Sequence, residues 1–240
     1  MRFCLSKMYL CKKKFKLALI LNIETSTKNC SVSLADGINL LQLKEVNDGS
    51  YSHGEMLHVY IDEVIKKANK NLTDLDAIAV SKGPGSYTGL RIGVSAAKGL
   101  CYSLDIPLIS VSTLASLAST LKVEKDAMII PLLDARRMEV YSSIYDSNYH
   151  QIREIKAEII SENSFAKYLE KGKVYFLGDG ADKCKGTIIH RNAIFLDDHF
   201  PSAKEMVYFS SQKFKYNDFE DVAYFEPFYL KDFIAIKSNK

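Results

Sequence analysis

The chain has 240 residues, of which 47% are hydrophobic and 25% are charged, the balance of a globular protein with a sizeable core. Its five cysteines are an odd number, widely spaced and without a CxxC pair. This pattern excludes a disulfide framework and a zinc-finger site, and it is typical of a cytoplasmic protein. No apolar run is long enough to cross a bilayer, so we expect no membrane partner.

Charge is unevenly distributed along the chain. Six of the 32 basic residues lie in residues 1–16, which contain no acid, and residues 17–240 then carry 26 basic and 29 acidic ones. A mildly acidic body does not favour stand-alone binding of nucleic acid, which needs clustered lysine and arginine. The run Leu17–Leu21 is too short for a signal peptide, so we interpret residues 1–16 as a disordered basic tail, with Met8 as an alternative start.

The first half of the chain is predicted to alternate strands with two long helices. Continuous or alternating apolar residues indicate the strands, an Asp-Gly pair joins two of them, and a 3.6-residue apolar period indicates the helices. The predicted order is strand, strand, strand, helix, strand, helix, strand, at residues 17–23, 29–35, 38–46, 53–69, 76–81, 86–104 and 107–111.

The second half repeats this pattern with different residues. Strands are predicted at 127–133, 139–145 and from 149 onward, followed by a helix at 162–171, a strand at 173–177 and a helix at 202–214. Both halves begin with an apolar strand that ends in an acid, Glu24 or Asp134, before a polar turn and a hairpin. The sequence therefore predicts an α/β protein of two similar lobes, 17–118 and 119–240, that face each other across a ligand-binding cleft.

Two segments of the first lobe follow predicted strands and could hold an anion. Asn22–Thr27 exposes hydroxyl and backbone N–H groups, although a hairpin turn stabilised by these side chains is the simpler interpretation. Gly83–Gly93 places glycines before a helix, which suits either an anion or close packing on the sheet, and it is neither a P-loop nor a GxGxxG motif.

The segment Asp134–Tyr141 places one acid and two cations at the mouth of the second lobe. These charges could contact an anion across the cleft, or they could form an ion-paired hairpin corner, and the sequence leaves both open. The predicted nucleotide- or anion-contacting residues of the two lobes are Thr25, Ser26, Gly83, Gly85, Ser86, Asp134 and Arg136.

Metal binding and nucleophilic catalysis find little support. His53 and His58 are five residues apart on a predicted helix and so lie on different faces. HExxH and GxSxG motifs are absent, and Cys30 and Cys101 lie in apolar segments typical of buried thiols. We therefore predict no catalytic residue and no metal site.

The motifs NIETST, GPGSYTGLRIG, DARRMEVY and EPFYL resemble the TsaB (YeaZ) family, over about residues 17–230. The resemblance implies the actin/Hsp70/sugar-kinase type of fold, with two duplicated lobes that each have a mixed sheet and flanking helices. It also implies a role beside a TsaD-like catalytic subunit and a TsaE-like ATPase, in transferring threonylcarbamoyl to the adenosine beside the tRNA anticodon. ATP would then be used by the wider complex, with no cofactor tightly bound here, and tRNA would be met only through the complex.

The same resemblance separates this chain from the catalytic paralogue. TsaD-type proteins carry an HxxxH metal pair after the strand that follows the glycine-rich helix, whereas Val111–Ala118 contains no histidine. We therefore predict a non-catalytic partner subunit. One alternative is an ATP-dependent kinase or carbamoyltransferase that uses Glu24 and Asp134. The other is a metallopeptidase, which the missing histidines disfavour.

The two long helices of the first lobe are predicted to form a partner surface. The apolar stripe of 53–69 is wider than one sheet contact needs, and 86–104 offers small residues and few charges. The resemblance implies that the same helices pair either with a second copy, as a homodimer, or with TsaD. The predicted interface residues are Met56, Leu57, Tyr60, Gly89, Gly93, Ser95 and Ala97.

Overall fold

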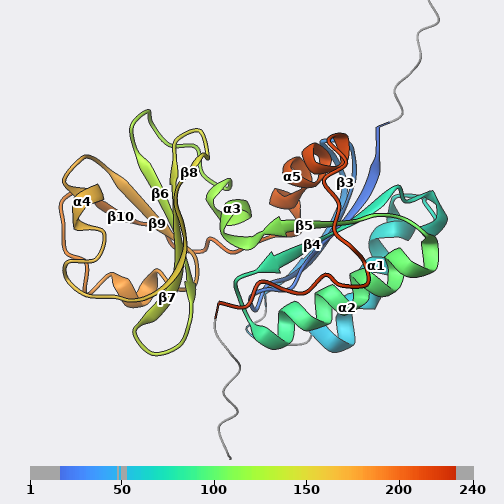
Figure 1. The fold of residues 1–240 in the computed structure, drawn as a ribbon, viewed down its shortest axis with the longest axis horizontal. Coiled ribbons are helices and arrows are strands. Elements are labelled where there is room, and N and C mark those ends of the chain that lie inside the picture. The colour runs from blue at the N-terminus through green and yellow to red at the C-terminus, as the bar shows by residue number, and fades with distance from the viewer. Residues whose placement is uncertain (1–16, 48, 50–52, 231–240) are drawn as a thin grey trace, which may run out of the picture.

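The computed structural model describes residues 17–47, 49 and 53–230, and the predicted tail lies outside them. Two five-stranded sheets form the centres of two lobes that lie side by side (Figure 1). The first sheet has the order β3-β2-β1-β4-β5 and consists of β1 (Leu19–Glu24), β2 (Cys30–Asp36), β3 (Asn39–Val46), β4 (Ala77–Gly83) and β5 (Leu108–Ser112). Its helices are α1 (His53–Lys67), α2 (Tyr87–Leu104) and α5 (Ala203–Lys215), with a short 3₁₀ turn, η1 (Leu72–Asp74), before β4.

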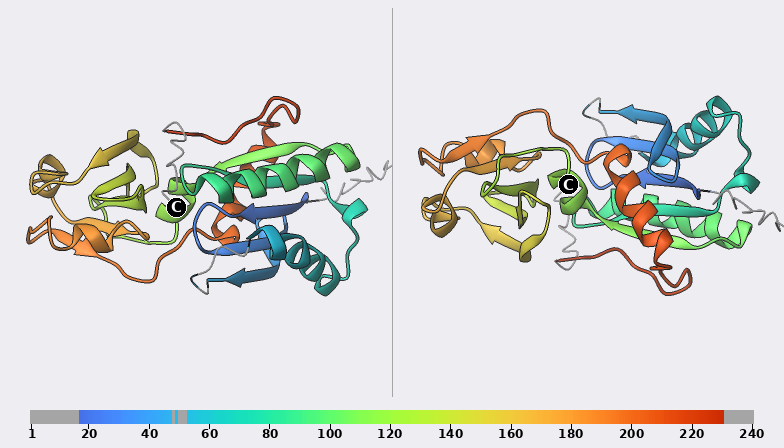
Figure 2. Two further views of the ribbon diagram at one scale, coloured as in Figure 1. Left: turned by 90° about the horizontal axis from the view of Figure 1, so that it is seen from below. Right: turned by 90° about the horizontal axis from the view of Figure 1, so that it is seen from above.

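Alternation of side chains along β1 explains why both faces of the first sheet are covered. Leu21 and Ile23 lie in a core shared with α1 and α2, whereas Ile20 packs with Met206 of α5 on the opposite face. All four side chains are completely buried. Figure 2 shows α2 in front when the molecule is seen from below and α5 in front when it is seen from above. The first sheet is therefore the middle layer between helices, as apolar strands on both faces require.

The second sheet repeats the pairing of the first. It has the order β8-β7-β6-β9-β10, with two antiparallel pairs followed by two parallel pairs, as in the first sheet. Its strands are β6 (Met128–Asp134), β7 (Glu139–Asp146), β8 (Gln151–Ile159), β9 (Val174–Leu177) and β10 (Ala193–Phe195). Phe176 packs on the side of α4 (Ala166–Leu169) and Leu177 on the side of α3 (Thr113–Ala118). The predicted α/β fold with two duplicated lobes is confirmed.

The C-terminal part of the chain returns to the first lobe. Helix α5 contacts every strand of the first sheet, although residues 119–240 were predicted to form the second lobe. After α5, Glu220 forms a β-bridge with Leu108, and Phe225 packs into the core beneath α2. Residues 203–230 therefore lie with the first sheet and not in the second lobe, where they were predicted. A helical period identifies α5 but does not say which sheet it covers.

We call residues 217–230 the C-terminal strap, because they lie along α2 in an extended path (Figure 1). Lys98 of α2 donates hydrogen bonds to the carbonyl oxygens of Ala223 and Phe225, both at 3.0 Å. The Phe228 N–H donates to the Lys82 carbonyl oxygen at 2.7 Å. Gly83 has φ +102°, and a Cβ there would lie 3.1 Å from the Phe228 carbonyl oxygen, so glycine lets the strap pass close to β4.

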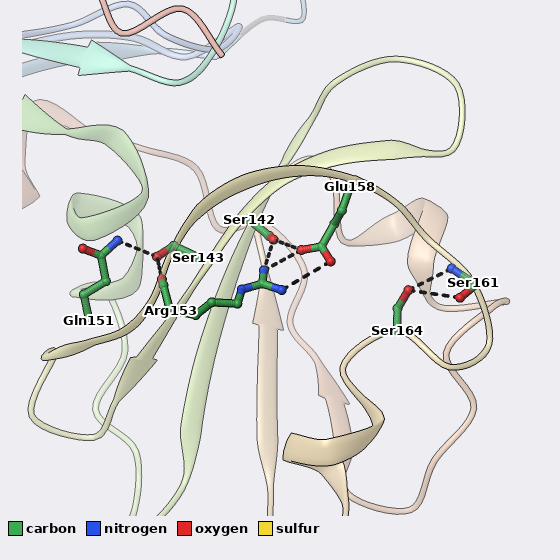
Figure 3. Close-up of polar contacts among 7 residues, drawn as sticks. All are labelled: Ser142, Ser143, Gln151, Arg153, Glu158, Ser161 and Ser164. Atoms are coloured by element: carbon green, nitrogen blue, oxygen red, sulfur yellow. Dashed lines mark hydrogen bonds and ion pairs between the residues drawn. The ribbon is translucent and has the colours of Figure 1, made fainter. Parts of the chain in front are cut away.

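A polar network ties β7 to β8 in the second lobe (Figure 3). The Arg153 guanidinium pairs with the Glu158 carboxylate, and both groups contact the Ser142 hydroxyl. Ser143, on the other face of β7, donates to the Arg153 carbonyl oxygen at 2.7 Å. The pairing register of β7 and β8 shifts between Ser142 and Ile144, and these side-chain bonds hold the strands together at that irregularity.

Two local elements differ from the prediction. The helix predicted at 162–171 is reduced to Ala166–Leu169, because Phe165 at its N-cap has a left-handed backbone and no side-chain cap. Strand β10 has three half-buried residues and too little periodicity to be predicted.

Candidate functional site

Three glycines let α2 pack directly on the turn that follows β1. A Cβ added at Gly85 would lie 2.4 Å from the Ser26 carbonyl oxygen, and one at Gly89 would lie 2.1 Å from the Thr25 carbonyl oxygen. At Gly93 the added Cβ would lie 2.3 Å from Thr25 Oγ1. Real Cβ atoms essentially never approach other atoms within 3.0 Å. The glycine side of α2 is therefore filled by the chain's own turn.

Most residues predicted to contact an anion take part in this same packing. Thr25 Oγ1 donates to the Gly89 carbonyl oxygen at 2.8 Å, and the Ser86 N–H donates to the Ser26 carbonyl oxygen at 2.6 Å. Ser86 Oγ caps α2 by accepting from the Gly89 N–H at 3.3 Å. The structure brings Thr25, Ser26, Gly85 and Ser86 together, and their observed interactions are those of packing and capping. Anion binding at this turn stays a prediction.

Glu24, at the end of β1, is a fully buried carboxyl group. Its Oε1 accepts hydrogen bonds from the Ser26 N–H at 2.6 Å and from Ser81 Oγ at 2.8 Å. Loss of hydration raises the pKa of Glu24, although these hydrogen bonds act in the opposite direction. Burial, together with the charge of Glu24, raises the pKa of Cys30 to about 12. Glu24 therefore has no exposed oxygen with which to bind a metal ion.

Asp134 and Arg136 lie at a hairpin corner of the second lobe, and the Lys183 side chain is at the centre of this corner. The Asp134 carboxylate pairs with the Lys183 ammonium and accepts from the Arg136 N–H at 2.8 Å. Lys183 also donates to the Arg137 carbonyl oxygen at 2.9 Å. Of the two interpretations left open by the sequence, the ion-paired corner is the one observed. The Arg136 guanidinium is exposed and has no ion-pair partner within the described ranges.

Two charged residues that act on the Asp134 corner, Asp179 and Lys28, were not predicted from the sequence. Asp179 Oδ1 accepts from the Asp134 N–H at 3.0 Å. Desolvation raises the pKa of Asp179, as does the Asp134 charge, whereas Lys183 and Lys28 lower it. Lys28 belongs to the first lobe, in the turn that follows β1. The only signal for Asp179 is the Gly-Asp-Gly turn at 178–180, which by itself is a weak motif.

A groove of about 550 Å³ runs between α1 and α2 on the outer side of the first lobe. Its lining includes Gly54, His58, Arg91, Ile92, Ser95 and Gly99. Gly54, Ser95 and Gly99 place little side chain between the helices, and the larger Ile92 and Leu100 add apolar surface to the lining. This is the outward surface of the two helices that were predicted to meet a partner.

The predicted interface residues are for the most part on the wrong face. Leu57, Tyr60, Gly89, Gly93 and Ala97 are buried against the chain's own sheet, strands and turn, and Met56 is half-buried. Ser95 alone of the predicted set lines the groove. The apolar stripe of α1 is broad because it covers β2 and β3 and also contacts α2. It therefore needs no partner to explain it.

The described part of the chain has neither a metal-binding cluster nor a membrane-spanning helix. No group of three or more His, Cys, Asp or Glu side chains there is arranged to hold a metal ion. None of the helices there is long and apolar enough to cross a membrane. In α3, the segment that was contrasted with the histidine pair of TsaD-type proteins, Thr113, Leu114 and Leu117 are completely buried. The absence of a metal stays a prediction.

The class of protein is defined first by the fold. A solved structure of YeaZ from Pseudomonas aeruginosa superimposes with a TM-score of 0.74, over 89% of this chain and 100% of that chain, at 23% identity. A second Pseudomonas aeruginosa structure, described as similar to peptidase YEAZ, gives 0.75 over 90% of this chain and 100% of that chain, also at 23% identity. These likenesses show that the chain has the two-lobed fold of YeaZ.

Sequence comparison then gives the family. The family model of TsaD, tRNA N6-adenosine threonylcarbamoyltransferase, matches residues 47–236. TsaB of Buchnera aphidicola subsp. Baizongia pistaciae is 30% identical over 90% of this chain and 99% of its own length. TsaB of Escherichia coli K12 is 28% identical over 91% and 96%. The chain belongs to the TsaB (YeaZ) family of tRNA threonylcarbamoyladenosine biosynthesis proteins.

Proposed function

We propose that this chain is the non-catalytic subunit that binds and supports a TsaD-like threonylcarbamoyltransferase, and that the groove between α1 and α2 is the docking surface. The observation that carries the proposal is this groove, which is open, is lined by small residues together with Ile92 and Leu100, and belongs to a lobe with its own hydrophobic core. A groove with these properties accepts a helix without rearrangement of the chain. Family membership supports the choice of partner.

Three features support the absence of catalysis. Val111–Ala118 has no histidine and its helix is buried, so the metal pair of the transferase has no counterpart there. Glu24 is buried, and Asp134 is paired with Lys183. The two acids that an ATP-dependent enzyme of this fold would use are therefore both engaged in structural interactions.

The wider complex follows from the same proposal. A TsaE-like ATPase would use the ATP, tRNA would be met only through the assembled complex, and the reaction would take place in the cytoplasm. Without its partner, the chain would pair with a second copy through the same groove. Because one groove would serve both interactions, the homodimer and the heterodimer exclude each other.

Co-purification tests the docking surface. The chain is co-expressed with the TsaD-like protein of its host, and Ser95→Glu places a charge at the groove. We expect this variant to lose co-purification while its circular dichroism stays that of the parent protein. Ser103→Glu is the matched control, because Ser103 is exposed on the same helix and does not line the groove. Tyr60 is unsuitable for this test, since a charge at a buried position would unfold the lobe. Normal binding by the folded Ser95→Glu variant would show that the partner docks elsewhere.

A second experiment separates a partner subunit from an enzyme. The purified chain is assayed alone for ATP turnover and for bound iron or zinc. We expect neither. An ATPase or kinase activity that disappears in an Asp134→Asn variant would instead support the ATP-dependent alternative.

A further inference from the structure

The groove is lined by one residue that is always charged, Arg91 of α2, and by no carboxylate. Arg91 takes part in no ion pair among the residues that the structure describes. Within the described ranges, its guanidinium donates one hydrogen bond, from Nη1 to the Tyr87 hydroxyl at 3.0 Å. An always-charged guanidinium thus faces the groove with most of its donors unused.

The position of Arg91 is fixed by aromatic side chains. Its guanidinium lies 5.1 Å from the centre of the Tyr87 ring, one helical turn earlier. The Tyr87 ring in turn contacts the Tyr229 ring of the C-terminal strap, with centroids 5.0 Å apart. The strap is held along α2 by Lys98. Little side-chain freedom would therefore be lost when Arg91 binds a partner group, which favours affinity and selectivity.

Docking of a helix in the groove must remove water from Arg91. A guanidinium that is covered by an apolar surface is left unpaired, at a large cost in free energy. A carboxylate opposite Arg91 instead gives two parallel charge-assisted hydrogen bonds. The rest of the lining on α2 includes Ile92, Ser95, Ala96 and Gly99. These residues suit a partner helix with small and apolar side chains, which can approach closely.

We propose that Arg91 is a specificity-determining residue of the groove, and that the TsaD-like subunit docks a helix that presents an aspartate or glutamate to it. This inference rests on the proposed function and adds the chemistry by which the partner is recognised. A partner helix without the carboxylate is rejected, because it leaves a desolvated charge. A second copy of the chain is the competing occupant, since the exposed Glu55 lies on α1 next to the groove residue Gly54.

Binding of the purified TsaD-like subunit at low and high salt tests this role. We expect Arg91→Gln to weaken binding about 10–100-fold at low salt and to flatten its salt dependence, with Arg91→Lys in between. Lys66→Gln is the matched control, because it removes one positive charge from α1 outside the groove, and it should bind like the parent chain. Arg91 is exposed, so its variants should keep the parent melting temperature.

The outcomes separate this inference from the proposed function. If Arg91→Gln binds with parent affinity while Ser95→Glu does not bind, the groove is the docking surface, and the inference that a partner carboxylate recognises Arg91 is wrong. If Ser95→Glu binds normally, the docking surface itself is wrong. If Arg91→Gln dissociates a homodimer in analytical ultracentrifugation but leaves binding of the TsaD-like subunit unchanged, Arg91 serves a second copy and the inference is overturned.

Discussion

Substitution of Gly89 by alanine should destabilise the first lobe, whereas the same substitution at Gly99 should not. Both glycines lie in α2, so each gains about 1 kcal/mol of helix propensity from alanine. At Gly89 the new Cβ would lie 2.1 Å from the Thr25 carbonyl oxygen, more than 1 Å inside ordinary contact distance. At Gly99 nothing lies within 4 Å of the new Cβ. The two variants therefore differ only in the contact that α2 makes with the turn.

The magnitude at Gly89 follows from what must move. The Thr25 carbonyl is backbone and cannot rotate away, so the helix and the turn must separate by about 1 Å. Overpacking typically costs about 1–3 kcal/mol, and we expect this separation to cost an amount at the upper end of that range. The separation also weakens the bond from Thr25 Oγ1 to the Gly89 carbonyl oxygen, by about 1 kcal/mol. After the gain in propensity, we expect a net loss of about 3 kcal/mol for Gly89→Ala and a gain of about 1 kcal/mol for Gly99→Ala.

Differential scanning calorimetry measures both variants on one scale. For a chain of this length, about 3 kcal/mol corresponds to a melting temperature lower by about 6–12 °C for Gly89→Ala, and the control should rise by about 2–4 °C. Urea unfolding at 25 °C gives the same comparison as free energies. Equal melting temperatures for the two variants would refute the interpretation of the glycines as contact residues and would reopen their role as a ligand-binding turn.

Three further outcomes are expected. Glu24→Gln should remove a pH dependence, because the pKa of Glu24 is raised in the folded state. The stability that the neutral carboxyl contributes is fully present below about pH 4.5 and is lost as pH rises through the raised pKa. Glutamine stays neutral at every pH, so the melting temperature of the variant should exceed that of the parent by more at pH 8 than at pH 5. Parallel pH curves would contradict this. Lys183→Met should cost about 1–2 kcal/mol in urea unfolding, since the 134–139 corner loses its ammonium donor; an unchanged midpoint would count against that role. Deletion of residues 1–16 should leave melting temperature and partner binding unchanged, and a loss of several degrees would show that the tail packs.

Strands and long helices were predicted well, because burial on two faces and a 3.6-residue period are properties of single segments. The run at 17–23 is apolar throughout because its alternate side chains meet α1 and α2 on one face and α5 on the other. The repeat of strand, acid and hairpin after Glu24 and Asp134 likewise marks the duplication, since each lobe must build the same sheet from local pieces.

Properties that depend on distant segments were not predictable in this way. Tyr60 and Leu57 lie on an apolar stripe, and a sequence cannot say whether a stripe meets the chain's own core or a partner. Lys183 and Asp134 are 49 residues apart, so their ion pair appears only when β6 and β9 are placed side by side. The small residues of 86–104 did indicate a surface for close approach, but they did not show that Ser95 and Gly99 face the groove while Gly89 and Gly93 face the chain's own turn.

The return of α5 to the first sheet has a consequence for synthesis on the ribosome. The face of that sheet formed by Ile20, Ile109 and Val111 is covered by residues made only after the whole of the second lobe. At about 5–20 residues per second, translation of residues 119–202 takes about 4–17 s, during which this apolar face has no cover from its own chain. The nascent first lobe is thus a natural client for chaperones that shield apolar surface. Nascent chains stalled before residue 203 should aggregate, whereas chains released at full length should not.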